Sequence, residues 1–208
     1  MSNEHQYSRE LIEIRDLMER STRFLSLSGL AGVLAGIYAL VGVYVASNIL
    51  DYDPLALGAQ FMAEGPIPAA LIQLLSLGLT VLVLALGSAI FLASKKARKR
   101  GEPAWNPTSR RLLTHLAVPL FAGGLLILVM ISQGMIIWIA PMTLIFYGLG
   151  LYNASKFTYE HAKILGIIMA GLGILNAYFL EYGLLFWALG FGVAHILYGI
   201  YMYLRYER

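Results

Sequence analysis

The sequence contains no cysteine, and only 13% of its 208 residues are charged. Without a thiol, the chain cannot form disulfides, iron–sulfur clusters, thiolate zinc sites or a covalently attached haem. A soluble globular domain has about 25% charged residues, so this low charge, together with 59% hydrophobic residues, places the chain in the membrane class.

Recognisable catalytic motifs are also absent from the sequence. It has no phosphate-binding loop, no HExxH motif, and no nucleophile–base pair or paired carboxylates. We therefore predict a protein that is not an enzyme and that holds no metal or cofactor, and we keep a haem or quinone enzyme as the catalytic alternative.

Long apolar runs alternate with short charged connections. A membrane-spanning helix needs about 20 residues, and six runs qualify: 24–48, 69–93, 112–132, 135–153, 164–180 and 183–204. Threading them alternately places all 15 Lys and Arg residues on one side, seven of them between residues 95 and 111. The connections on the other side carry only acidic charges, at Asp51, Asp53, Glu64 and Glu181. Because basic residues stay on the cytoplasmic side, we predict an all-α, six-helix protein of the bacterial inner membrane with both termini in the cytoplasm.

Residues 1–23 precede the first apolar run and have a different pattern. Charged and apolar residues alternate, and Leu11, Ile14 and Leu17 recur at helical spacing, which predicts an amphipathic helix. This helix is either an interfacial anchor or a docking site for a cytoplasmic protein. The predicted organisation is a cytoplasmic helix over 1–23, a bundle over 24–204 and a cytoplasmic tail over 205–208.

The six predicted helices fall into three hairpins with similar sequences. Residues 87–95 (GSAIFLASK) align with residues 148–156 (GLGLYNASK), and small residues recur early in the first helix of each pair. This favours a repeat of helical hairpins in parallel. A ridge of small residues on the first helix packs either within the chain or in a homo-oligomer; it consists of Ser28, Gly32 and Gly36.

Residues 29–37 (GLAGVLAGI) and 190–200 (GFGVAHILYGI) are rich in glycine. With three such hairpins and both ends in the cytoplasm, the chain resembles the HdeD-type small membrane proteins of bacteria. It also resembles uncharacterised six-helix membrane proteins of Bacteroidetes-type bacteria. The first resemblance implies a link to acid resistance, and the second implies no activity.

Polar side chains within the spans are the candidate functional residues, because an unpartnered polar group in hydrocarbon is costly. His195 lies near the middle of the sixth run. It is either a pH sensor, proton relay or haem ligand, or a neutral ring hydrogen-bonded to Tyr198 or to a neighbouring helix. The candidate ligand-binding residues are Gln73, Asn153, Asn176, His195 and Tyr198, with interhelical hydrogen bonding as the alternative role.

The first acidic connection contains two further features. Residues 55–62 predict a short interfacial helix. Asp51, Asp53 and Glu64 offer oxygen ligands for calcium or magnesium, although Asp before Pro is also common in turns.

The leading functional hypothesis is a protein that binds or transports a small molecule in a polar cavity that includes His195. The alternative is a structural or regulatory module. It would dock a cytoplasmic partner or anionic lipid headgroups through the 1–23 helix and the 95–111 loop. We expect no nucleic-acid partner, because the basic residues cluster at the ends of apolar runs instead of covering a soluble face.

Overall fold

A computed structural model describes residues 28–64, 68–99, 101, 103 and 105–208. The predicted helix over 1–23 and the first residues of the 24–48 run lie outside this part of the chain. Within it, six helical segments are long and apolar enough to cross a membrane, as predicted, and no strand occurs.

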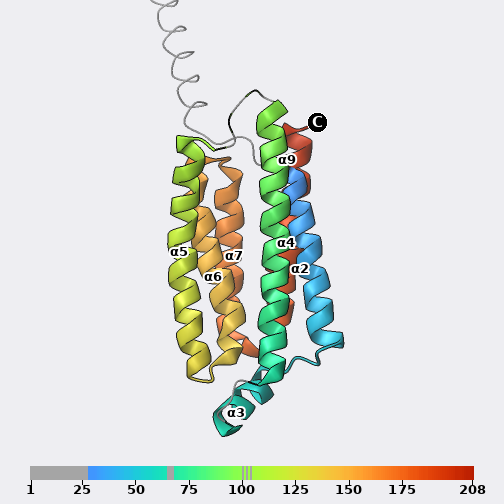
Figure 1. The fold of residues 1–208 in the computed structure, drawn as a ribbon, viewed down its shortest axis with the longest axis vertical. Helices are drawn as coiled ribbons and strands as arrows, with labels where there is room; N and C mark the ends of the chain where they lie inside the picture. The colour runs from blue at the N-terminus through green and yellow to red at the C-terminus, as the bar shows by residue number, and fades with distance from the viewer. Residues whose placement is uncertain (1–27, 65–67, 100, 102, 104) are drawn as a thin grey trace, which may run out of the picture.

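The helices in chain order are α2 (Gly29–Asn48), α3 (Pro54–Glu64), α4 (Ala69–Lys99), α5 (Pro107–Ser132), α6 (Ile139–Ala154), α7 (His161–Tyr178), α8 (Gly183–Trp187) and α9 (His195–Tyr206) (Figure 1). Single 3-10 turns cover Ile136–Trp138, Ser155–Phe157 and Leu180–Tyr182. A π-helical stretch, Ala188–Ala194, joins α8 to α9. The fourth span is therefore Ile136–Phe157, and the sixth is Leu180–Tyr206.

The helices extend beyond the predicted apolar runs at the basic loop. α4 continues to Lys99 instead of ending at residue 93, because lysine and arginine are good helix formers and are favoured near a helix C-terminus. α5 begins at Pro107 instead of residue 112 because Asn106 and Ser109 form a capping box. The Asn106 side chain accepts from the Ser109 amide at 2.8 Å, and the Ser109 hydroxyl accepts from the Asn106 amide at 2.9 Å.

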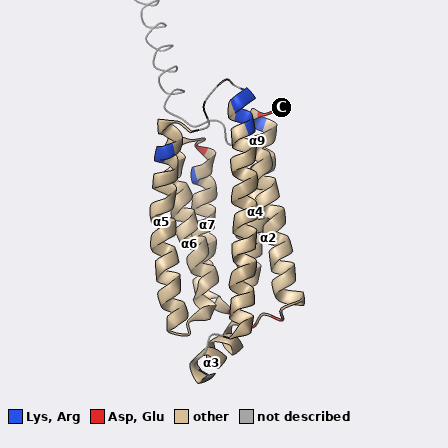
Figure 2. Cartoon of the chain, viewed as in Figure 1, with Lys and Arg blue, Asp and Glu red and all other residues tan. Residues whose placement is uncertain are grey.

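Charge is separated along the bundle. Lys and Arg residues gather where α4 ends, where α5 and α7 begin, and near the end of α9 (Figure 2). Asp51 and Asp53 lie at the opposite end, beside α3. We call these the basic end and the acidic end. The separation agrees with the predicted threading, and the side of the membrane that each end faces stays a prediction.

The helices form an open arc. α5 packs on α6, α6 on α7, α7 on the π-helical stretch, this stretch and α9 on α2, and α2 on α4. α4 and α5 are consecutive in the chain but scarcely touch, and they stand apart in Figure 1. Buried residues make up only 6% of the most apolar stretch of α4 and 11% of that of α5, compared with 28–33% in the other four spans.

Glycines permit the closest helix contacts in the arc. A Cβ atom at Gly199 of α9 would lie 2.5 Å from the Val33 nitrogen and 2.6 Å from the Gly29 oxygen of α2. A Cβ atom at Gly148 of α6 would lie 2.6 Å from the Gly166 oxygen of α7. Side chains here would force the backbones apart, so glycine sets the spacing of both pairs.

The ridge of small residues on α2 packs within the chain. A Cβ atom at Gly32 would lie 3.1 Å from the Gly199 Cα, and one at Gly36 would lie 2.6 Å from the Gly192 oxygen. Of the two arrangements that the sequence left open, the structure therefore shows the intramolecular one for this face.

Glu207 joins three helices at the basic end. One carboxylate oxygen accepts from the Gly29 amide at 2.7 Å and from Lys96 Nζ at 3.0 Å, and the other accepts from the Ser28 hydroxyl at 3.2 Å. The carboxylate thus caps the N-terminus of α2, where unpaired amides and the helix dipole favour negative charge. Lys96 connects this cap to α4.

We expect Gly199→Ala to destabilise the bundle, because the new methyl group would meet the α2 backbone, which cannot rotate away. Overpacking typically costs about 1–3 kcal/mol, or roughly 2–12 °C in melting temperature for a chain of this size. The measurement is thermal unfolding followed by circular dichroism in one detergent.

Gly124→Ala on α5 is the matched control. No described atom lies within 4 Å of a Cβ atom at Gly124, and alanine is favoured over glycine within a helix by about 1 kcal/mol. This variant should be as stable as the parent protein or slightly more stable. Equal melting temperatures for the two variants would contradict the role given to Gly199.

Candidate functional site

His195 lies where the π-helical stretch meets α9, and its side chain is buried. Its Nδ1 is 2.9 Å from the Gly190 carbonyl oxygen, and its Nε2 is 2.9 Å from the Tyr147 hydroxyl on α6. A carbonyl oxygen can only accept, so Nδ1 carries the proton and Nε2 accepts from Tyr147. Both ring nitrogens of the neutral imidazole therefore have partners.

The surroundings of His195 are aromatic and apolar. Its ring centroid lies 5.4 Å from that of Tyr147 and 5.9 Å from that of Phe191. Tyr198, like Tyr147 and Phe191, packs against a buried core of Leu144, Leu165 and Met169. Of the sequence-based interpretations, the structure matches a neutral histidine bonded to a neighbouring helix. These contacts hold the π-helical stretch against α6 and leave neither ring nitrogen for a ligand.

Apart from Tyr198, the predicted ligand-binding residues do not gather around His195. Gln73 is exposed on α4 towards the acidic end, and Asn153 lies near the basic end of α6. Asn176 is fully buried near the acidic end of α7, where its amide nitrogen donates to the Phe179 carbonyl at 3.1 Å. Its side-chain oxygen has no hydrogen-bond partner in the described structure. The five residues thus span the length of the bundle.

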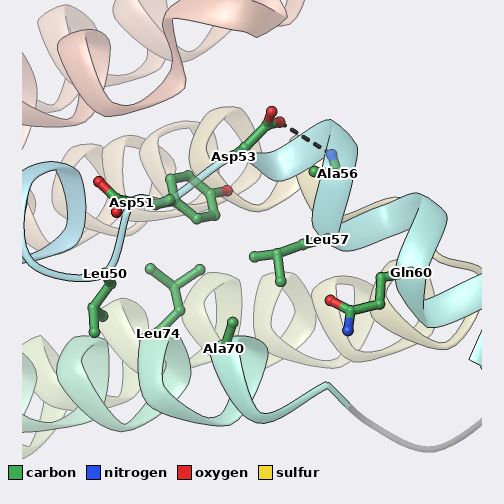
Figure 3. Close-up of a pocket in the computed structure, with 9 residues that line it drawn as sticks. Leu50, Asp51, Asp53, Ala56, Leu57, Gln60, Ala70 and Leu74 are labelled. Carbon is green, nitrogen blue, oxygen red and sulfur yellow. Dashed lines mark hydrogen bonds between the residues drawn. The ribbon is translucent and has the colours of Figure 1, made fainter.

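A hollow of about 130 Å³ lies at the acidic end, between the α2–α3 turn, α3 and the start of α4 (Figure 3). This is close to the size of a cavity that takes up benzene, about 150 Å³. In Figure 3, Leu74 and Ala70 lie on one side of the hollow and Asp51 and Asp53 on the other. The lining residues are Leu50, Asp51, Tyr52, Asp53, Ala56, Leu57, Gln60, Ala70 and Leu74.

The helix α3, which forms one side of the hollow, is held by an N-terminal cap and by packing against residues distant in the sequence. Asp53 accepts from the Leu55 amide at 2.9 Å and from the Ala56 amide at 3.0 Å, so it caps α3. Leu57 is buried with Leu71 of α4 and Ile136, which precedes α6. The short helix predicted over 55–62 is thereby confirmed, and it connects the two halves of the arc at the acidic end.

Asp51 shapes the rim of the hollow. Its φ of +42° lies in the left-handed region, which Asp and Asn tolerate better than most side chains. The resulting turn ends α2 and lets the Tyr52 amide donate to the Ala46 carbonyl at 3.1 Å. Within the described part of the chain, the Asp51 carboxylate makes no hydrogen bond or ion pair.

The predicted cation ligands Asp51, Asp53 and Glu64 are not shown to form one site, although Asp51 and Asp53 both line the hollow. Asp53 serves as the cap of α3, and the Glu64 side chain lies outside the described structure. No group of three metal-binding side chains occurs in the part of the chain that the structure describes.

Tyr52 lines the hollow as an uncharged group. Burial, and to a smaller extent the charge of Asp53, raises the pKa of the Tyr52 phenol to about 12. Its hydroxyl therefore stays protonated at physiological pH and adds no negative charge to the hollow.

No known family model matches this chain, and comparison with curated proteins and with solved structures finds no similar protein. The resemblance to HdeD-type proteins stays a prediction.

Tyr147→Phe should lower the free energy of unfolding by about 1–3 kcal/mol, because it leaves a buried acceptor, His195 Nε2, without a donor. Tyr178→Phe is the control, since the Tyr178 side chain is 83% exposed. Chemical denaturation of both variants in one detergent measures the difference. If both variants match the parent protein, the Tyr147–His195 bond does not stabilise the fold.

Alkaline titration tests the burial of Tyr52. Its folded pKa exceeds the ordinary value of about 10, so the stability linked to its proton is complete below pH 10 and is lost as pH rises through 12. The difference in phenolate absorbance between the parent protein and Tyr52→Phe should show one phenol that ionises near pH 12. Ionisation near pH 10 would show that Tyr52 is exposed.

Proposed function

We propose that this protein is a non-catalytic, multi-pass protein of the bacterial inner membrane that binds a small molecule in the hollow at its acidic end. The observation that carries the proposal is the hollow itself. Small-molecule sites are concave and mostly apolar, with a few polar groups that orient the ligand. Leu57, Ala70 and Leu74 supply the apolar surface, and Asp51 and Tyr52 supply polar groups.

The proposed orientation places the basic end in the cytoplasm. The supporting observation is the gathering of Lys and Arg at that end, which follows the positive-inside bias. The hollow then opens on the opposite side of the membrane, where it meets solutes from outside the cytoplasm.

The hollow replaces His195 as the proposed binding site. The sequence favoured a polar cavity around this histidine, but both of its ring nitrogens are committed to Tyr147 and Gly190. A ligand there would have to break two hydrogen bonds that are already made. Binding in the hollow requires no such exchange, because the Asp51 carboxylate is uncommitted within the described structure.

The exposed face of α4 supports a second candidate, a structural or regulatory module. Gln73, Ser76 and Thr80 are exposed on this face, although the span is strongly apolar. Ser76 and Thr80 donate to carbonyls of their own helix at 2.8 Å, so their hydroxyls are satisfied. A protein partner on this face would shield Gln73 from lipid, and the 95–111 loop would bind anionic headgroups.

Filling the hollow tests the first candidate. Ala70→Phe and Ala56→Phe place a ring in the hollow from opposite walls, and Ala122→Phe places the same ring on the exposed surface of α5. A native mass spectrum of protein released from mild detergent should show a retained small molecule in the parent protein and in Ala122→Phe, and none in the filled variants.

A small molecule that remains in both filled variants would contradict binding in the hollow. A spectrum of the parent protein that shows only an oligomer or a second polypeptide would overturn the first candidate in favour of the module. Circular dichroism of every variant confirms that helix content is retained.

A further inference from the structure

We infer that the hollow at the acidic end binds a small organic monocation, an ammonium group with a short alkyl chain, and that Asp51 is its charged partner. This inference rests on the proposed function and names the ligand class for the same site. Three properties of the hollow support it: the charge of its lining, its apolar surface and its size.

The charge of the lining selects cations. Among the described residues that line the hollow, Asp51 and Asp53 are the charged ones, and both are acidic. The carboxylate of Asp53 already accepts two amides at the start of α3, where the helix end carries roughly half a positive charge that offsets it. Asp51 has no such partner in the described structure. Among the described lining residues, the exposed carboxylate of Asp51 is therefore the one charge that no protein group offsets, and it suits a single positive charge.

The apolar surface selects an organic cation over a metal ion. Calcium takes six to eight oxygen ligands, and magnesium requires a near-octahedral set. Asp51 supplies one uncommitted carboxylate, and much of the lining is hydrocarbon from Leu50, Leu57 and Leu74. An alkyl chain that leaves water for this surface gains about 0.8 kcal/mol per buried methylene, whereas a hydrated ion gains nothing there.

The polar groups beside Asp51 fit an ammonium donor. Tyr52 keeps its hydroxyl proton at physiological pH, so it contributes an oxygen acceptor without a second full charge. The volume of about 130 Å³ corresponds to roughly the six non-hydrogen atoms of benzene. Butylammonium, with five non-hydrogen atoms, is therefore a suitable probe.

The backbone at Asp51 provides variants that should fold. Asn and Gly both adopt the left-handed conformation found at this position, so Asp51→Asn and Asp51→Gly remove the charge without straining the turn. Glu181→Gln is the charge-matched control, because Glu181 is exposed in a different turn, Leu180–Tyr182, and does not line the hollow.

The experiment is calorimetric titration of the full-length protein in a neutral detergent, with empty micelles as the blank. The probes are butylammonium, 1-butanol and butyrate, which share a chain length and differ in charge. Butylammonium should bind the parent protein and Glu181→Gln within twofold of each other, and both Asp51 variants at least tenfold more weakly. Butanol should bind at least tenfold more weakly than butylammonium, and butyrate should not bind.

Three results would overturn the inference, and they are distinguishable. In the first, Ala70→Phe abolishes binding, but butanol binds as well as butylammonium or the Asp51 variants keep full affinity. The hollow is then a binding site but not a cation site. If no probe binds the parent protein, the inference fails, and the native mass spectrum still decides the proposed function. If binding survives Ala70→Phe, the probes bind outside the hollow, and the proposed function fails together with the inference.

Discussion

The close contact between the backbones of α2 and the sixth span is the constraint on which the rest of the structure depends. Gly29, Gly32 and Gly199 let the two helices approach until main-chain atoms meet. Lipid chains provide no hydrophobic drive between helices, so dense packing of this kind has to stabilise the pair. The same approach brings Glu207 to the N-terminus of α2 and places Lys96 beside it. The basic end is thus fixed by a carboxylate that caps one helix and pairs with another.

The acidic end depends on α3 in the same way. This short helix leaves α2 through the left-handed turn at Asp51 and inserts Leu57 between α4 and the start of the fourth span. It therefore connects two halves of an arc whose terminal helices, α4 and α5, scarcely touch. The hollow forms because the turn, the helix and the beginning of α4 enclose a space that their side chains do not fill.

The sequence predicts the parts of this fold that follow from local pattern. The lengths of the apolar runs and the positions of Lys and Arg were sufficient to predict the six spans, and the sequence of residues 55–62 predicted the short helix α3. Contacts between distant segments have no such local pattern in the sequence. Glu207 caps a helix that begins 178 residues earlier, and the partner of His195 proved to be Tyr147 on another helix. The hollow could not be predicted either, because it depends on how Leu57 packs against Leu71 and Ile136.

The most direct test of the account is the labelling of one introduced thiol, since the chain has no cysteine of its own. Ala56→Cys places this thiol in the lining of the hollow. In intact cells, a membrane-impermeant maleimide should modify it, and butylammonium should slow the reaction while 1-butanol leaves its rate unchanged. Labelling only after lysis would contradict the proposed orientation, and a rate unaffected by butylammonium would contradict the assignment of the hollow as a cation site.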